Sequence, residues 1–260
     1  MFNNLNEIKN RTPLLPYIVR PLVYSFRDFI AVEEYLPQRA FVQAYGFVPT
    51  GDVKIDYAVF LGNGPNINSD PEEGQTGVDT TDSFLVGGRL GIRVGEWKAG
   101  ISVTRDHFNV APLEITPGDV IDLQQLTRRR LGADVSCAWN ELSFEAEFID
   151  VSYDDDRPEI SEDKRFYYAT LGYRTSERSL IYGSYWVTRE HSTEQVDPYP
   201  VGILKQRVEV PTIGISYQMR ESIMLKAQFA PVDIELRVPS WGLEHEVEFD
   251  HLSAAVSVVF

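Results

Sequence analysis

The chain has 260 residues and a formal net charge of −15, with 24 Lys and Arg against 39 Asp and Glu. This acidic balance argues against nucleic acid as a partner, because no basic stripe is available to neutralise phosphates. No apolar run reaches the roughly 18 residues that a transmembrane helix needs. The mean hydropathy of −0.22 does not exclude a membrane β-barrel, because alternate residues of its strands face water and dilute the hydropathy.

The cysteine and the acidic residues limit the kinds of metal site and covalent cross-link that the chain can contain. Cys137 is the single cysteine, which excludes an internal disulfide and a cysteine-based zinc site. Acidic residues gather in the segments around 70–73 and 154–163. The simpler interpretation is that these segments are solvated loops, and the more specific alternative is that they bind a divalent ion. Because no calcium loop with a central Gly and a final Glu occurs, we expect neither a metal nor a cofactor.

The N-terminal segment, residues 1–38, fits no single pattern. It shows no basic region followed by an apolar core, so no secretory signal is visible and the sequence is either mature or starts late. Residues 18–26 are compatible with a strand, and residues 27–35 with a short helix or an inward loop.

From residue 39 to residue 260 one rhythm repeats: about ten residues of alternating character, a tight turn, about ten more, and a long polar loop. Val53, Ile55 and Tyr57, for example, alternate with Lys54 and Asp56, which is the period of a strand. This rhythm predicts strands at 39–48, 53–63, 83–94, 97–105, 125–138, 142–153, 164–174, 179–190, 206–218, 223–234 and 246–260.

Turn signals such as Gly95-Glu96 and Asn140-Glu141 join pairs of these strands, whereas the other connections are long, such as 105–124 and 190–206. Short turns at one end and long loops at the other are typical of membrane barrels. The sequence therefore predicts an all-β fold, an antiparallel up-and-down transmembrane β-barrel. It has eleven strands, or twelve if residues 18–26 add one.

Aromatic residues distinguish a membrane barrel from a soluble one. Rings beside the short turns, on the apolar face, predict a belt at a membrane interface; they are Trp97, Trp139, Tyr173, Tyr217 and Phe260. Aromatics that cap a soluble core are the alternative. The last strand favours the membrane, because it alternates from Leu252 to a terminal Phe260 and so resembles the C-terminal signature that the assembly machinery of bacterial outer-membrane proteins reads.

Short motifs add a family resemblance. Asn6-Glu7-Ile8, the stretch Pro13 to Tyr24, Gln43-Ala44-Tyr45-Gly46, Asn63-Gly64 and Arg89-Leu90-Gly91 resemble segments of the porin superfamily that includes phosphate-selective porins. The likeness extends loosely to the C-terminus. It indicates membership of this superfamily but gives no indication of specificity for phosphate. It implies a location in the bacterial outer membrane, contact with its lipid, and a homotrimer as the assembly. Such proteins usually carry a signal peptide and several earlier strands, so the chain is expected to be a short barrel or the C-terminal part of a larger one.

The polar face supplies the candidate functional residues. By parity the lumen is lined by Arg89, Arg93, Arg128, Arg130, Glu145, Glu147, Lys98 and Lys226, with Asp56 and Asp134 on the same face. Opposed charges of this kind create a transverse field and set ion preference; ion pairs that brace the wall are the alternative. Arg129 falls on the lipid side, so it must lie near an interface unless the register slips there.

Catalysis is not expected. The chain contains neither G-x-S-x-G nor H-E-x-x-H, and its four histidines fall mostly in or near predicted loops. Asp106-His107 at a strand end is similar to acid–base pairs of outer-membrane proteases or lipases, but such neighbours are common in loops. The sequence predicts a channel for passive diffusion of small hydrophilic solutes or ions. The alternatives are a structural, non-conducting envelope barrel and a soluble ligand-binding β-barrel.

Overall fold

The computed structural model describes residues 41–63, 84–109, 113–116, 119–121, 125–154, 160–194, 203–239 and 242–258. The strand expected at 18–26, the helix or inward loop expected at 27–35, and Phe260 lie outside these residues. No helix of the described residues is long and apolar enough to cross a membrane.

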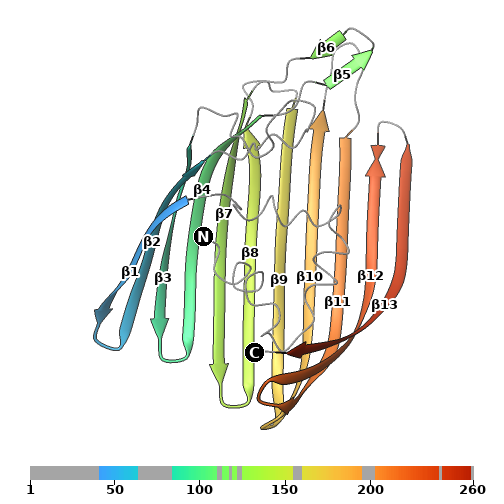
Figure 1. Ribbon diagram of the computed structural model, residues 1–260. Coiled ribbons are helices and arrows are strands. Elements are labelled where there is room, and N and C mark those ends of the chain that lie inside the picture. The colour runs from blue at the N-terminus through green and yellow to red at the C-terminus, as the bar shows by residue number, and fades with distance from the viewer. Residues whose placement is uncertain are drawn as a thin grey trace.

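The fold is all-β. One antiparallel sheet contains eleven strands in up-and-down order, as predicted (Figure 1). Its strands are β1 (Phe41–Thr50), β2 (Val53–Asn63), β3 (Phe84–Val94), β4 (Trp97–Asn109), β7 (Gln125–Trp139), β8 (Leu142–Asp154), β9 (Ile160–Ser176), β10 (Ser179–Glu194), β11 (Ile203–Arg220), β12 (Ile223–Val238) and β13 (Leu243–Val258). A separate hairpin of β5 (Leu113–Thr116) and β6 (Asp119–Ile121) lies beyond the strand ends that are opposite the short turns. Within the described residues β1 and β13 each have one neighbour in the sheet.

The short turns occur where the sequence predicts them. Two-residue turns at 51–52, 95–96, 140–141, 177–178 and 221–222 join successive strands at one end of the sheet (Figure 1). Gly95 and Asn140 open their turns with φ of 57° and 52°. Such turns match the twist of a hairpin but require a positive φ, which glycine and asparagine adopt most readily.

At the other end the strands are longer than predicted. β4 continues to Asn109, β9 begins at Ile160, β10 continues to Glu194 and β12 continues to Val238. The prediction ended these strands early because charged residues accumulate there. The strand alternation nevertheless continues there, but the apolar residues are now the buried ones and the charged residues the exposed ones. Ile234 and Val238 are buried, whereas Arg237 between them is exposed.

The sheet therefore has two faces, which we call outer and inner. The outer face carries most of the large exposed apolar residues, such as Ile101 and Ile213, and the inner face carries most of the buried side chains. On β3, Phe84, Val86 and Leu90 are exposed while Leu85 between them is 1% exposed. A sheet whose exposed face is the apolar one is the reverse of a soluble sandwich and is typical of a barrel wall in lipid.

Candidate functional site

An apolar band runs along the outer face above the short turns. On β4 the outward residues are Trp97, Ala99, Ile101 and Val103, and the first charge is Arg105. The eight steps from Trp97 to Arg105 cover roughly 27 Å along the strand at about 3.4 Å per residue. The hydrocarbon-facing band of a membrane barrel is about 25 Å tall, and a tilted strand needs somewhat more than that length to cross it.

Strands β7 to β13 repeat this order. Their first outward charges or polar residues after the band are Arg129 on β7, Asp150 on β8, Arg165 on β9, Arg189 on β10, Glu209 on β11, Asp233 on β12 and Asp250 on β13. Arg129 lies directly opposite Arg105 and is exposed. The predicted alternation, which placed Arg129 on the outer face, is therefore correct, and no register slip occurs there. Arg129 lies at the boundary of the apolar band.

Four of the five predicted aromatic residues are described by the structure, and they lie at the lower edge of this band. Trp97, Trp139, Tyr173 and Tyr217 are on the outer face within a few residues of the short turns, with exposed fractions of 58%, 64%, 51% and 43%. Large rings exposed to this extent at one level are the arrangement expected at a membrane interface.

Tryptophan fluorescence in vesicles of brominated lipid tests this belt. If the outer face contacts lipid, a variant that keeps only Trp97 should be quenched strongly, because its ring is exposed on that face. A variant that keeps only Trp186, which is on the inner face and 3% exposed, serves as the control and should be quenched weakly. Equal quenching of both variants contradicts the assignment of the outer face to lipid.

The inner face carries the eight residues expected in the lumen. Arg89, Arg93, Arg128, Arg130, Glu145, Glu147, Lys98 and Lys226 all have the inward parity in the observed register. They differ in access to solvent: Arg128, Arg130, Glu147 and Lys226 are buried, whereas Arg93 and Lys98 are exposed. Arg89 and Glu145 are half-buried. The predicted set thus ranges from buried side chains to the exposed Arg93 and Lys98 near the short turns.

Arg89 connects three strands through ion pairs. Its guanidinium donates to Asp56 on β2 at 3.1 Å and to Asp134 on β7 at 2.7 Å. The side chain can lie flat because Gly91 and Gly100 are directly opposite each other beneath it, and a Cβ added to either glycine would collide with it. The two glycines therefore create the space in which Arg89 braces the wall from β2 to β7.

Arg128 and Arg130 share one carboxylate. Asp106 accepts two hydrogen bonds from Arg128, at 3.0 and 2.9 Å, and one from Arg130 at 3.1 Å. Arg130 also donates to the Thr104 hydroxyl at 3.2 Å. Asp106, Arg128 and Arg130 are only 2%, 4% and 1% exposed, so this cluster is a buried, charge-assisted network rather than a set of free charges.

Sequence reasoning missed the role of Asp106. The prediction ended the strand at residue 105 and considered Asp106 only beside His107, whereas β4 continues to Asn109. The signal was present, because Ser102, Thr104 and Asp106 keep the inward parity. Aspartates are the partners in the ion pairs recorded here: Asp56 and Asp134 for Arg89, Asp56 for Arg93, and Asp106 for Arg128 and Arg130.

Above the level of the band the two faces exchange character. The inner face of β8 to β12 becomes apolar there and buries Ile149, Val151, Phe166, Trp186, Val208, Val210, Val232 and Ile234. Tyr168 stacks on Trp186 with ring centroids 4.6 Å apart. At the same level the outer face becomes charged. This is the polarity expected of a wall surrounded by water, and it marks where the apolar band ends.

Comparison with known proteins gives likeness in structure alone. No protein-family model matches the sequence, and no curated protein matches it. Among solved structures the chain is similar to outer-membrane expressed OmpT of Vibrio cholerae, with 12% identity and a TM-score of 0.49 over 82% of this chain and 62% of that one. It is also similar to the ferric yersiniabactin uptake receptor FyuA from Yersinia pestis, with 10% identity and a TM-score of 0.35 over 84% of this chain and 40% of that one. The chain spans less than two thirds of the length of either protein.

Proposed function

We propose that this chain forms a barrel wall in the bacterial outer membrane and lets small hydrophilic solutes diffuse passively across it. The supporting observation is the polarity of the two faces at the level of the apolar band. The outer face is aliphatic and aromatic there, while the inner face carries polar side chains such as Ser102, Asp134, Thr170, Thr212 and Gln228. A polar wall inside an apolar one suits a water-filled lumen. The sequence resemblance to the porin superfamily agrees with it.

Exposed cations near the short turns are the best candidates for setting ion preference. Lys54, Arg93 and Lys98 lie directly opposite one another on β2, β3 and β4, on the inner face. Arg93 is paired with Asp56 at 2.7 Å, but no ion pair is recorded for Lys54 or Lys98 among the described residues. A row of cations at one mouth raises the local concentration of anions. We therefore expect a preference for anions at low salt.

Planar-bilayer recordings test both conduction and preference. The double substitution Lys54→Glu and Lys98→Glu should move the reversal potential toward cations, and the shift should shrink as salt rises, because screening weakens the field. Arg189→Glu with Lys205→Glu makes the same change of charge on the outer face, on β10 and β11, and should leave the reversal potential unchanged. An equal shift from both variants contradicts the assignment of Lys54 and Lys98 to the lumen.

A structural, non-conducting barrel is the second candidate. It is favoured by the buried and compensated state of Arg89, Arg128 and Arg130, which brace the wall and present little free charge. Absence of any conductance in the unmodified protein would favour this function over the channel. A soluble ligand-binding barrel is the weakest of the three, because the outer face would then expose an uninterrupted apolar band to water.

A further inference from the structure

A row of like charges crosses the outer face just above the apolar band. Arg165 on β9 lies directly opposite Arg189 on β10, which in turn lies directly opposite Arg207 on β11. In the next row His191 lies opposite Lys205. Like charges directly opposite each other on neighbouring strands destabilise a sheet. An arrangement that repeats this on three strands is best stabilised by an anion bound to it.

The protein's own acids compensate the row only in part. Arg165 pairs with Asp150 at 2.9 Å at one end of the row, and Arg207 pairs with Glu209 at the other. In the middle, the guanidinium of Arg189 lies 5.9 Å from the centre of the Tyr167 ring, and no ion pair is recorded for it or for Lys205 among the described residues. The positive charge of the row is therefore concentrated at its centre.

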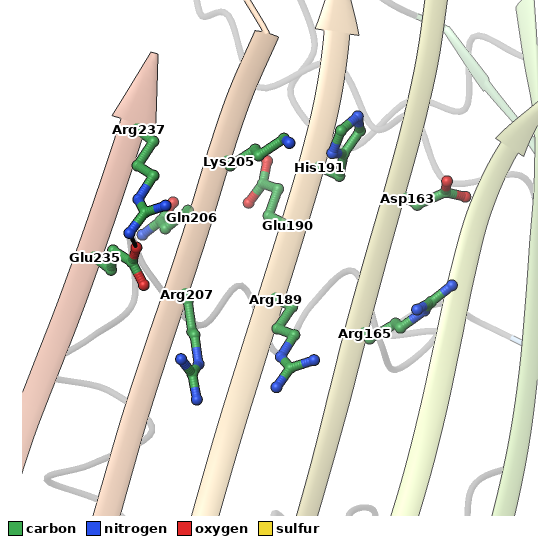
Figure 2. Close-up of a pocket in the computed structure, with 10 residues that line it drawn as sticks. All are labelled: Asp163, Arg165, Arg189, Glu190, His191, Lys205, Gln206, Arg207, Glu235 and Arg237. Atoms are coloured by element: carbon green, nitrogen blue, oxygen red, sulfur yellow. Dashed lines mark ion pairs between the residues drawn. The ribbon is translucent and has the colours of Figure 1, made fainter. Parts of the chain in front are cut away.

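These residues line a groove of about 630 Å³. Figure 2 shows Arg189 and Arg207 side by side on neighbouring strands, with Lys205 and His191 above them, and Arg165 on β9 extending away from Arg189 toward β8. Toward β12 the groove is bounded by Glu235, which pairs with Arg237. Two acids also line the groove itself: Asp163 on β9, which lies opposite His191, and Glu190 on β10, which pairs with Lys164. The acids that continue on β12 and β13, among them Asp233 and Glu248, would repel an anion as well, so the part of the groove around Arg189, Lys205 and Arg207 suits an anion best.

A second groove, of about 500 Å³, lies on β8 to β12 toward the short turns, within the apolar band. Small side chains form it, because Ala169 and Gly183 lie on the outer face between larger neighbours such as Leu171, Tyr185 and Ile213. The outward level between the two grooves holds Tyr167 and Val187, which are directly opposite each other. A basic groove above an apolar one, on the same strands, matches a molecule with an anionic head and an acyl chain.

We propose that this paired groove binds a phosphorylated lipid of the membrane leaflet at the level of the basic row. Arg189, Lys205 and Arg207 hold the phosphate, while Arg165, paired with Asp150, adds positive charge at the β8 end of the row, and an acyl chain lies over Gly183 and Ala169. Arginine and lysine suit a phosphate oxygen through charge-assisted hydrogen bonds, and the level is where a lipid headgroup meets the apolar band. The inference rests on the membrane placement of the proposed function and is independent of conduction.

The basic groove is tested by lipid binding to the purified protein in neutral detergent, followed by native mass spectrometry. The double substitution Arg189→Ala and Lys205→Ala should weaken binding of dioleoyl phosphatidic acid about 25-fold, since each cation at an anionic lipid surface contributes about fivefold. Dioleoyl phosphatidylcholine should bind weakly to both forms. Arg174→Ala with Arg178→Ala is the matched control, because it removes two exposed cations at the short-turn end of the same hairpin. Equal loss with both variants overturns the site.

The apolar groove is tested by Gly183→Leu. A Cβ at Gly183 would meet only the carbonyl oxygen of Thr212, at 3.8 Å, so leucine fills the groove without strain. Phosphatidic acid should then bind about tenfold more weakly, from lost burial of its chain, while binding of inorganic phosphate stays unchanged.

If inorganic phosphate competes as well as phosphatidic acid in the unmodified protein, a lipid is the wrong occupant. If the Arg189 and Lys205 double variant changes the oligomeric state but not lipid affinity, the surface is an interface between copies of the chain and the proposal is overturned. Lipid binding without conductance would contradict the channel alone.

Discussion

Replacing Ile101 with arginine is expected to destabilise the protein folded in a bilayer, lowering its free energy of unfolding by about 2–4 kcal/mol. Ile101 is on the outer face, 59% exposed, and lies midway between Trp97 and Arg105, the residues that bound the apolar band on β4. A guanidinium at this depth loses its water and finds no partner in the hydrocarbon. In a water-soluble protein the same change at so exposed a position would fall within about 0.5 kcal/mol.

Equilibrium folding from urea into phosphatidylcholine vesicles measures this effect. The matched control is Val94→Arg, also on the outer face and 44% exposed, but next to the short turn at Gly95. Near the interface an arginine costs about 0–1 kcal/mol, so the two substitutions should differ clearly. If Ile101→Arg is tolerated as well as Val94→Arg, the outer face is not in lipid and a soluble barrel becomes the better account.

Replacing Asp106 with asparagine should cost about 3–5 kcal/mol of stability, the usual result of breaking a buried ion pair from one side. Asp106 is the recorded anionic partner of both Arg128 and Arg130, and all three are almost inaccessible to solvent. Without the carboxylate, two buried guanidinium groups repel each other. The urea midpoint and the temperature of the heat-modifiable shift in gel migration should both fall.

Two further variants separate this cluster from ordinary surface charge. Asp150→Asn breaks the pair with Arg165, whose side chain is 57% exposed, and should cost at most about 1 kcal/mol. A triple variant with Asp106→Leu, Arg128→Met and Arg130→Met should recover most of the stability that Asp106→Asn loses, since apolar residues of similar size often replace a buried ion cluster without loss. A cost for Asp106→Asn no larger than that for Asp150→Asn would show that the cluster does not brace the wall.

The polarity exchange between the faces explains where sequence reasoning succeeded and where it stopped. Within the apolar band the turns and strands agree with the prediction to within two residues, as for β2 at Val53–Asn63 and β8 at Leu142–Asp154. Beyond the band the predicted strands end too early. There the outward residues, such as Glu235 and Arg237, are charged, and a stretch rich in charge reads as a loop unless the buried residues between them are recognised as one face of a strand.

The sequence by itself determined the strand period, the turns and the face on which each side chain lies, because a period of two and the demands of a tight turn are local properties. Only the tertiary structure decided which residues meet across strands. Arg89 reaches Asp134, 45 positions away in the chain, because β4 places Gly100 between them without a side chain to block the path. The grouping of Arg165, Arg189 and Arg207 likewise depends on the register of three strands. A slip of one residue would send each of these side chains to the other face, so neither the ion pairs of the wall nor the basic groove could be read before the register was known.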